Sequence, residues 1–153
     1  MCQNIGVESS RWPEGACFAE VLDRENALLS AVHDAVALRS WRIHLVAEVI
    51  DPRSPYASAL REVGGSGSDV RSGFLENWGR LIARALERAM SQQISDDRPD
   101  AQRRPGRRRI DADRTAVLIL AAVHGGVVLS RLSLDSHPID AALDLALAPL
   151  LND

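Results

Sequence analysis

The sequence predicts an all-α protein, folded as an antiparallel helical bundle. Residues 111–151 contain two apolar stretches rich in small residues and joined by a polar turn. Several earlier stretches place apolar residues three or four positions apart, which is the spacing of one helix face. The chain has 153 residues and is 46% hydrophobic, which suits one helical core and is too short for two domains of ordinary size. We therefore expect one helical domain over residues 18–151, after an irregular N-terminal segment over residues 1–17.

The first half of the domain contains signals for three helices. Apolar spacing predicts a first helix from Phe18 or Asp23 to Leu38. A second helix over residues 40–50 should end before Asp51-Pro52, because the residue before a proline is pushed out of the helical region. A short helix over residues 54–63 follows, with a proline in its first turn, and the glycines and serines of residues 64–68 predict a loop.

A long helix is expected over residues 69–93, followed by a charged connection. Its apolar side chains recur at helical spacing, and its opposite face is rich in arginine and glutamate, as in a solvated surface. Residues 95–110 are rich in arginine, contain two prolines and lack apolar periodicity, which predicts a flexible linker within the domain. Phosphate binding by the arginines is the rival interpretation, but no aromatic residue is interleaved and four aspartates lie close by.

The last two helices have the clearest ends. Asp111 or Asp113 can cap the first of them, and Pro138 suits the first turn of the second. Between Thr115 and Leu129 only His124 is strongly polar, as expected of a central helix enclosed by other helices. We exclude a membrane span, because the apolar run is shorter than the roughly 20 residues that cross a bilayer and arginines border it.

Small residues predict that these two helices pack closely as a hairpin. Gly125 and Gly126 each cost about 1 kcal/mol relative to alanine in a helix interior, so a close helix contact should offset them. The following helix offers small residues at positions 141, 142, 146 and 148, beside apolar residues at helical spacing.

At these residues the chain resembles the C-terminal domain of the TetR family of transcriptional regulators. The resemblance lies in D-x-D-R-T-A-x-L-I-L-A-A-x-H-G-G-x-x-L-S-x-L, followed by H-P-I-D-A-A-L-D-L-A-L-A-P-L-L, and a weaker one covers residues 73–91. It implies that the last two helices form a homodimer contact as a four-helix bundle, and that the preceding helices enclose a small-molecule pocket. The family places a helix-turn-helix domain ahead of this domain. Residues 1–18 cannot supply it, so we expect no direct DNA binding from this chain.

The resemblance and the helical spacing together suggest two groups of site residues. The expected dimer interface consists of Val123, Val127, Leu132, Ile139, Leu143, Leu147 and Leu150. The expected contacts with a small apolar ligand are Trp41, His44, Phe74, Trp78, Leu81, Leu120 and His124. The aromatic residues of this second group also suit a filled core, and His124 also suits a core histidine bonded to a backbone carbonyl.

The composition points to a cytoplasmic protein without nucleic-acid affinity. The net charge of -3 gives no overall attraction to phosphates, and all 18 basic residues are arginine. No signal peptide precedes the domain, and Cys2 and Cys17 lack the neighbours of a redox or metal motif, so we expect free thiols.

Catalytic and metal signatures are weak. His44 and Glu48 are four residues apart and could share a metal, but two ligands do not make a site. Residues 64–67 lack the preceding strand and the lysine of a phosphate loop, and no nucleophile motif occurs. We therefore expect no enzyme activity, no metal and no cofactor, although a buried histidine–carboxylate pair facing a cleft would favour a small enzyme.

Two functional interpretations remain from the sequence. The first is an effector-sensing and dimerisation domain similar to that of TetR-family regulators, which could also form mixed dimers with a full-length relative. The alternative is a structural or interaction module that dimerises without a ligand. A cavity of about 300 Å³ or more between the long and central helices would favour the first, and a filled core the second.

Overall fold

A computed structural model describes residues 15–65, 69–96 and 111–151, with the side chains of 94–96 left out. Within these ranges the chain forms helices and connecting turns and no strand, which confirms the all-α helical bundle. The helices are α1 (Ala16–Ser30), α2 (Ala35–Ile50), α3 (Pro55–Val63), α4 (Asp69–Asp96), α5 (Ala112–Ser133) and α6 (His137–Leu151).

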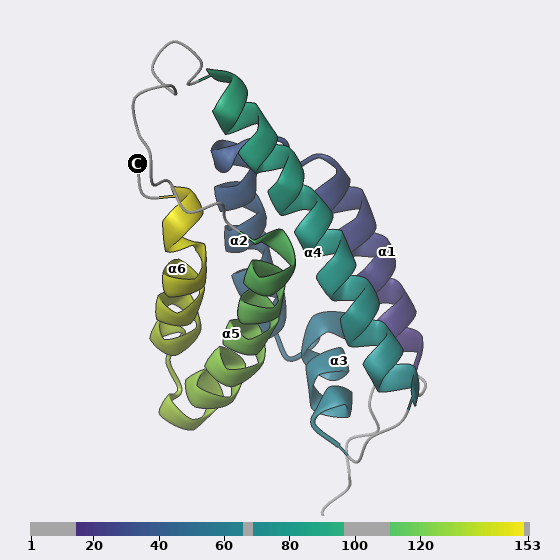
Figure 1. The fold of residues 1–153 in the computed structure, drawn as a ribbon. Helices are drawn as coiled ribbons and strands as arrows, with labels where there is room; N and C mark the ends of the chain where they lie inside the picture. Colours follow the sequence, from purple (N-terminus) through teal and green to yellow (C-terminus); the bar gives the residue numbers. More distant parts are fainter. Residues whose placement is uncertain (1–14, 66–68, 97–110, 152–153) are drawn as a thin grey trace, which may run out of the picture.

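The long helix α4 lies between the two halves of the bundle (Figure 1). It packs against α1 on one side and against α5 on the other, and the short helix α3 closes the end of the bundle beside α1. Helix α6 packs along α5 and also contacts α2, which lies behind the pair in Figure 1. The core is formed by apolar side chains from all six helices.

The predicted first helix is two helices in the structure. Instead of continuing to Leu38, α1 ends at Ser30, and α2 starts at Ala35 rather than at the predicted Ser40. Asp34 causes the new start, since its carboxylate accepts a hydrogen bond of 2.7 Å from the backbone N–H of Ala37. Backbone carbonyl groups at the end of α1 receive hydrogen bonds from α4. The Arg88 side chain of α4 donates to carbonyls of the last turn of α1 and of the following loop.

The other predicted boundaries are closer to the structure. Ser54 caps α3 and Pro55 occupies its first turn, as expected. Helix α4 continues to Asp96, so the first two residues of the predicted linker 95–110 are helical, and most of that linker lies outside the described residues. The predicted irregular segment 1–17 also lies mostly outside them, although its last two residues already belong to α1.

The predicted hairpin of the last two helices is confirmed. Asp111 caps α5 by accepting hydrogen bonds from two backbone N–H groups of its first turn, at 3.1 and 3.2 Å. A Cβ on Gly126 would lie 2.7 Å from the Cα of Ile139, so only glycine permits this approach of α5 to α6. The Ser130 hydroxyl also accepts a hydrogen bond of 3.3 Å from the Ile139 backbone N–H.

Candidate functional site

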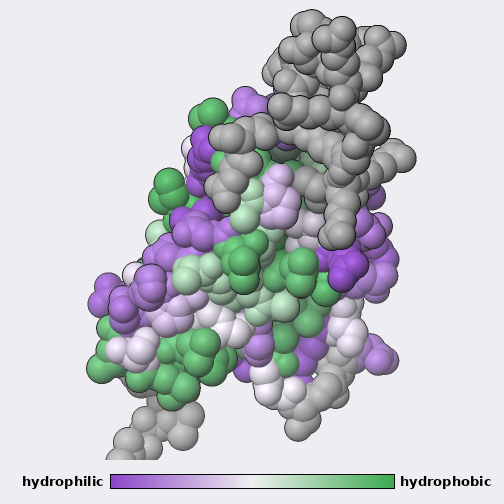
Figure 2. Space-filling model, turned by 60° about the vertical axis from the view of Figure 1, so that its left-hand side comes forward, coloured by the Kyte–Doolittle hydropathy of each residue, from purple (hydrophilic) through white to green (hydrophobic). Residues whose placement is uncertain are grey.

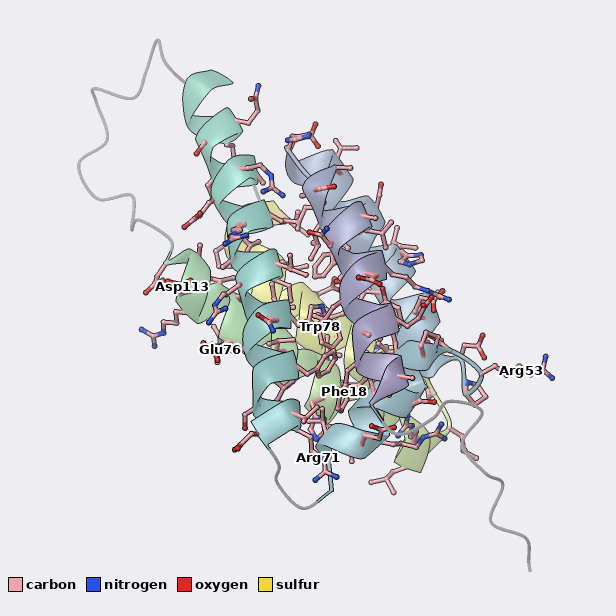
Figure 3. All side chains as sticks on the ribbon, turned by 90° about the vertical axis from the view of Figure 1, so that its right-hand side faces the viewer. Phe18, Arg53, Arg71, Glu76, Trp78 and Asp113 are labelled. Atoms are coloured by element: carbon pink, nitrogen blue, oxygen red, sulfur yellow. The ribbon has the colours of Figure 1, made fainter. Side chains whose placement is uncertain are left out.

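The predicted ligand contacts include an aromatic cluster in the interior of the bundle. Trp41, Phe74 and Trp78 are buried, and Phe74 lies between Trp78 and Phe18, with ring centroids 5.4 and 4.4 Å away. Figure 3 shows Phe18 and Trp78 pointing into the space between α1 and α4, whereas Arg53 points away from the bundle. Sequence spacing therefore identified interior residues correctly.

A buried carboxylate that the sequence analysis missed lies at the centre of this cluster. The Glu25 side chain is fully buried on α1 and accepts three hydrogen bonds from three other helices. Its Oε2 atom accepts from the indole N–H groups of Trp41 at 3.1 Å and Trp78 at 2.9 Å. Its Oε1 atom accepts from the Tyr56 hydroxyl at 2.8 Å. This Glu25 network therefore ties α1 to α2, α3 and α4.

Burial raises the pKa values of both acidic side chains in the Glu25 network, Glu25 and Tyr56. Removal from water raises the pKa of the Glu25 carboxyl, while the three hydrogen bonds and nearby His44 oppose that rise. Burial and the neighbouring Glu25 carboxylate likewise raise the pKa of Tyr56, so its hydroxyl stays protonated and available as a donor. No salt bridge reaches Glu25 within the described ranges, so neutral donors alone solvate this carboxylate.

The remaining predicted ligand residues do not complete a pocket. His44 lies edge-on to Tyr56 with ring centroids 6.5 Å apart, and Leu81 is partly buried against the core. Leu120 packs against Gly79 of α4, whereas His124 packs against Gly64 at the end of α3. Of the seven residues, the three aromatic ones are almost fully buried, whereas His44, Leu81, Leu120 and His124 are half-buried.

Two surface grooves occur elsewhere. The larger, of about 420 Å³, is lined by polar and charged residues of α4 and by His33. The smaller, of about 260 Å³, lies between the end of α2 and the α5–α6 turn. None of the seven predicted ligand residues lines either groove, so both lie away from the aromatic cluster.

The sequence places His44 and Glu48 four residues apart, where they could share a metal. Among the residues that the structure describes, no group of three metal-ligating side chains is close enough to hold an ion. The Glu48 carboxylate accepts a hydrogen bond from the Ser54 hydroxyl and lies 3.6 Å from the guanidinium of Arg24. It is thus engaged by groups other than His44.

The predicted dimer residues require a correction. Six of the seven are buried inside the chain, where they fill the core between α5, α6 and the other helices, and a second chain cannot touch them: Val123, Val127, Ile139, Leu143, Leu147 and Leu150. Leu132 alone is exposed among the seven. A partner that bound these two helices would therefore contact their exposed side.

That other side is apolar as well. We define the outer face of the α5–α6 hairpin as the exposed residues Leu118, Ala121, Gly125, Val128, Leu129 and Leu132 of α5 and Ala141, Leu145 and Pro149 of α6. The four leucines and the valine on it are 46–79% exposed. Figure 2 brings the hairpin forward and shows hydrophobic side chains over it, bordered by hydrophilic ones.

Three charged residues of the hairpin interact with α2 or α3 rather than lying on the outer face. On α6, Asp140 and Asp144 both bind the guanidinium of Arg42 on α2, with N–O distances of 3.1 and 2.7 Å. On α5, Arg131 lies close enough to Arg61 of α3 for their repulsion to lower the pKa of Arg131, although burial lowers it more. The outer face is therefore uncharged along most of its length.

Comparison with known proteins does not extend the family resemblance. No protein-family model, curated protein or solved structure matches the chain. Helix α5 is long and apolar enough to cross a membrane by length and composition, but it lines the core of the bundle along one side. The geometry of the outer face is thus the main guide to function.

Proposed function

We propose that this chain is a helical interaction module that forms a homodimer through the outer face of the α5–α6 hairpin. The observation that carries the proposal is the row of exposed large apolar side chains on this face, without an intervening charge. Contiguous apolar surface of this kind is uncommon on monomeric proteins and marks interaction sites. A second copy would remove these side chains from water.

The size of the face suits a stable pair. Helix α5 has 22 residues and is therefore about 33 Å long, α6 has 15 residues and is about 22 Å long, and each helix is about 10 Å wide. The resulting area is about 550 Å² per chain, so a dimer would bury about 1,100 Å² in total, just above the roughly 1,000 Å² expected of a specific interface.

The resemblance to TetR-family C-terminal domains supports the same mode of assembly. That family pairs its last two helices as a four-helix bundle, and this chain offers an apolar surface on the corresponding hairpin. We do not extend the proposal to effector sensing, because Trp41, Phe74 and Trp78 are almost fully buried within the chain and Glu25 already has three donors.

Light scattering after size-exclusion chromatography tests the proposal. The wild type should have twice the chain mass of 16.7 kDa, and Leu129→Glu should give a folded monomer because it places a charge in the interface. Ile43→Glu is the matched control, since Ile43 is exposed on α2, outside the outer face. A charge at the predicted interface residue Leu143, as in Leu143→Arg, would not test the dimer, because Leu143 is buried and the substitution would unfold the chain.

Two results would overturn the homodimer. One is a monomeric wild type at all concentrations. The other is a monomer that sediments with phosphatidylcholine vesicles and loses that binding in Leu129→Glu, which would assign the outer face to a membrane. Circular dichroism of each variant must show the helical content of the wild type.

A further inference from the structure

Two adjacent glycines of α5 have different surroundings. Gly126 is required inside the chain, because a Cβ there would collide with Ile139 of α6. At Gly125 an added Cβ would meet no atom within 4 Å in the described part of the chain. A glycine in a helix interior costs about 1 kcal/mol relative to alanine, and no contact with the described residues offsets this cost at Gly125.

Gly125 also lies at the centre of the outer face. Leu118 lies seven residues before it and Leu132 seven residues after it, while Ala121 and Leu129 lie four residues before and after it. When two identical helices cross antiparallel at one residue, a position that lies a given number of residues before the crossing faces the position the same number of residues after it on the partner. Leucine would then meet leucine at both ends of the contact, and alanine would accommodate the leucine of the partner beside the crossing.

The charges at the two ends favour the antiparallel orientation. Arg114, in the first turn of α5, and Asp135, in the turn after α5, are both exposed. They lie eleven residues before and ten residues after Gly125, so an antiparallel pair brings opposite charges together at each end. A parallel pair would instead place each arginine beside the arginine of the partner.

We propose that two copies of this chain pair about a two-fold axis at which α5 crosses its partner antiparallel at Gly125, with the two backbones in close contact. This inference rests on the proposed homodimer and specifies its register. The missing side chain at Gly125 permits the close approach, and the leucines on either side bury one another. The cost of the glycine is then offset in the dimer and not in the single chain.

Alanine at Gly125 tests the proposal through two effects of opposite sign. In the monomeric Leu129→Glu background, Gly125→Ala should raise the midpoint of thermal unfolding, because alanine favours a helix and its methyl group meets open space. In the wild-type background it should weaken dimerisation at least tenfold, as measured by sedimentation equilibrium. Gly73→Ala on α4 is the matched control, since a Cβ there also meets nothing within 4 Å. It should leave the dimer dissociation constant unchanged.

Disulfide trapping tests the register directly. Gly125→Cys in a Cys2→Ser background should form a covalent dimer on mild oxidation, because a residue on the axis faces its own copy at the 4.4–6.8 Å Cα distance of a disulfide. Cys17 can remain, since its thiol is buried and its pKa is raised to about 12. Ala121→Cys alone should not cross-link, because it lies about 6 Å along the helix from the axis. A mixture of Ala121→Cys and Leu129→Cys chains should cross-link as a heterodimer.

The outcomes separate this inference from the proposed function. One combination of results overturns the register but keeps the homodimer. The wild type is then a dimer that Leu129→Glu dissociates, while Gly125→Cys does not cross-link and Gly125→Ala does not weaken dimerisation. Efficient cross-linking of Ala121→Cys with itself would likewise overturn the antiparallel crossing. A monomeric wild type overturns both proposals.

Discussion

Replacing Glu25 measures what the buried carboxylate contributes to the fold. Glu25→Leu keeps an apolar side chain of similar size but leaves the donors of Trp41, Tyr56 and Trp78 without an acceptor. Each buried donor that loses its partner costs about 1–3 kcal/mol, so the three together cost about 3–9 kcal/mol. Relief of charge burial offsets part of this, and we expect a net loss of about 3 kcal/mol or more, a large fraction of a typical domain stability of about 5–15 kcal/mol.

Glu25→Gln separates the hydrogen bonds from the charge. The amide oxygen can take the place of Oε2 and accept from both indoles, while the amide nitrogen can donate to the Tyr56 oxygen. The variant loses the cost of a buried charge, but it leaves the Tyr56 hydroxyl hydrogen without its acceptor and one amide N–H without a partner. We therefore expect its unfolding free energy at pH 7 to be within about 1 kcal/mol of the wild type.

The pH dependence gives the sign of the charge effect. Burial raises the pKa of Glu25 in the folded state above its ordinary value of 4.5, so the folded chain holds this proton more tightly than the unfolded chain. The stability from this group is fully present below about pH 4.5 and is lost as the pH rises through the higher folded pKa. Glu25→Gln has no such titration, so its stability relative to the wild type should increase from pH 4.5 to pH 7.

Urea unfolding followed by circular dichroism measures these differences across a pH series. Two results would contradict these expectations. The first is a Glu25→Leu variant within 1 kcal/mol of the wild type at pH 7, which would mean that the three donors find other partners. The second is a constant difference between Glu25→Gln and the wild type over the whole pH range, which would mean that Glu25 titrates alike in both states.

Three further predictions concern other contacts. Gly126→Ala should lower the unfolding free energy by about 2 kcal/mol or more in urea titrations, because its Cβ would collide with Ile139; an unchanged midpoint would contradict this close approach. Arg42→Ala should lower the free energy of unfolding by about 1 kcal/mol at low salt and by less in 1 M salt, since the Arg42 guanidinium binds two aspartates of α6. Equal losses at low and high salt would point to lost packing instead. In a Cys2→Ser background, the Cys17 thiol should react with a disulfide reagent at pH 8 only after unfolding, because it is buried and its pKa is about 12; rapid native-state labelling would disprove this.

The helix boundaries that the sequence predicted well depend on local signals. Asp111 and Pro138 act on the backbone within a few residues, so their effect is independent of the rest of the fold. The break between α1 and α2 was missed because apolar residues continue at helical spacing across it as far as Val36, which is exposed in the structure. The cap at Asp34 was the signal that could have located this break.

The site residues were harder to predict, because periodicity identifies a face without saying what it meets. Trp41 and Trp78 are interior residues whether a cavity or a filled core lies between them. Glu25 was detectable, since it lies four residues after Val21 and four before Leu29, in the middle of the buried stripe of α1. Its three donors come from distant parts of the chain, and no local pattern could have identified them.

The character of α5 gives the strongest connection between sequence and assembly. A helix that is apolar on nearly every side requires neighbours on nearly every side. In this chain α4, α6 and α2 cover part of it, and Leu118, Leu129 and Leu132 remain exposed on the outer face. The prediction of a fully enclosed central helix is therefore wrong for the single chain, and the proposed homodimer would cover the part of α5 that remains exposed.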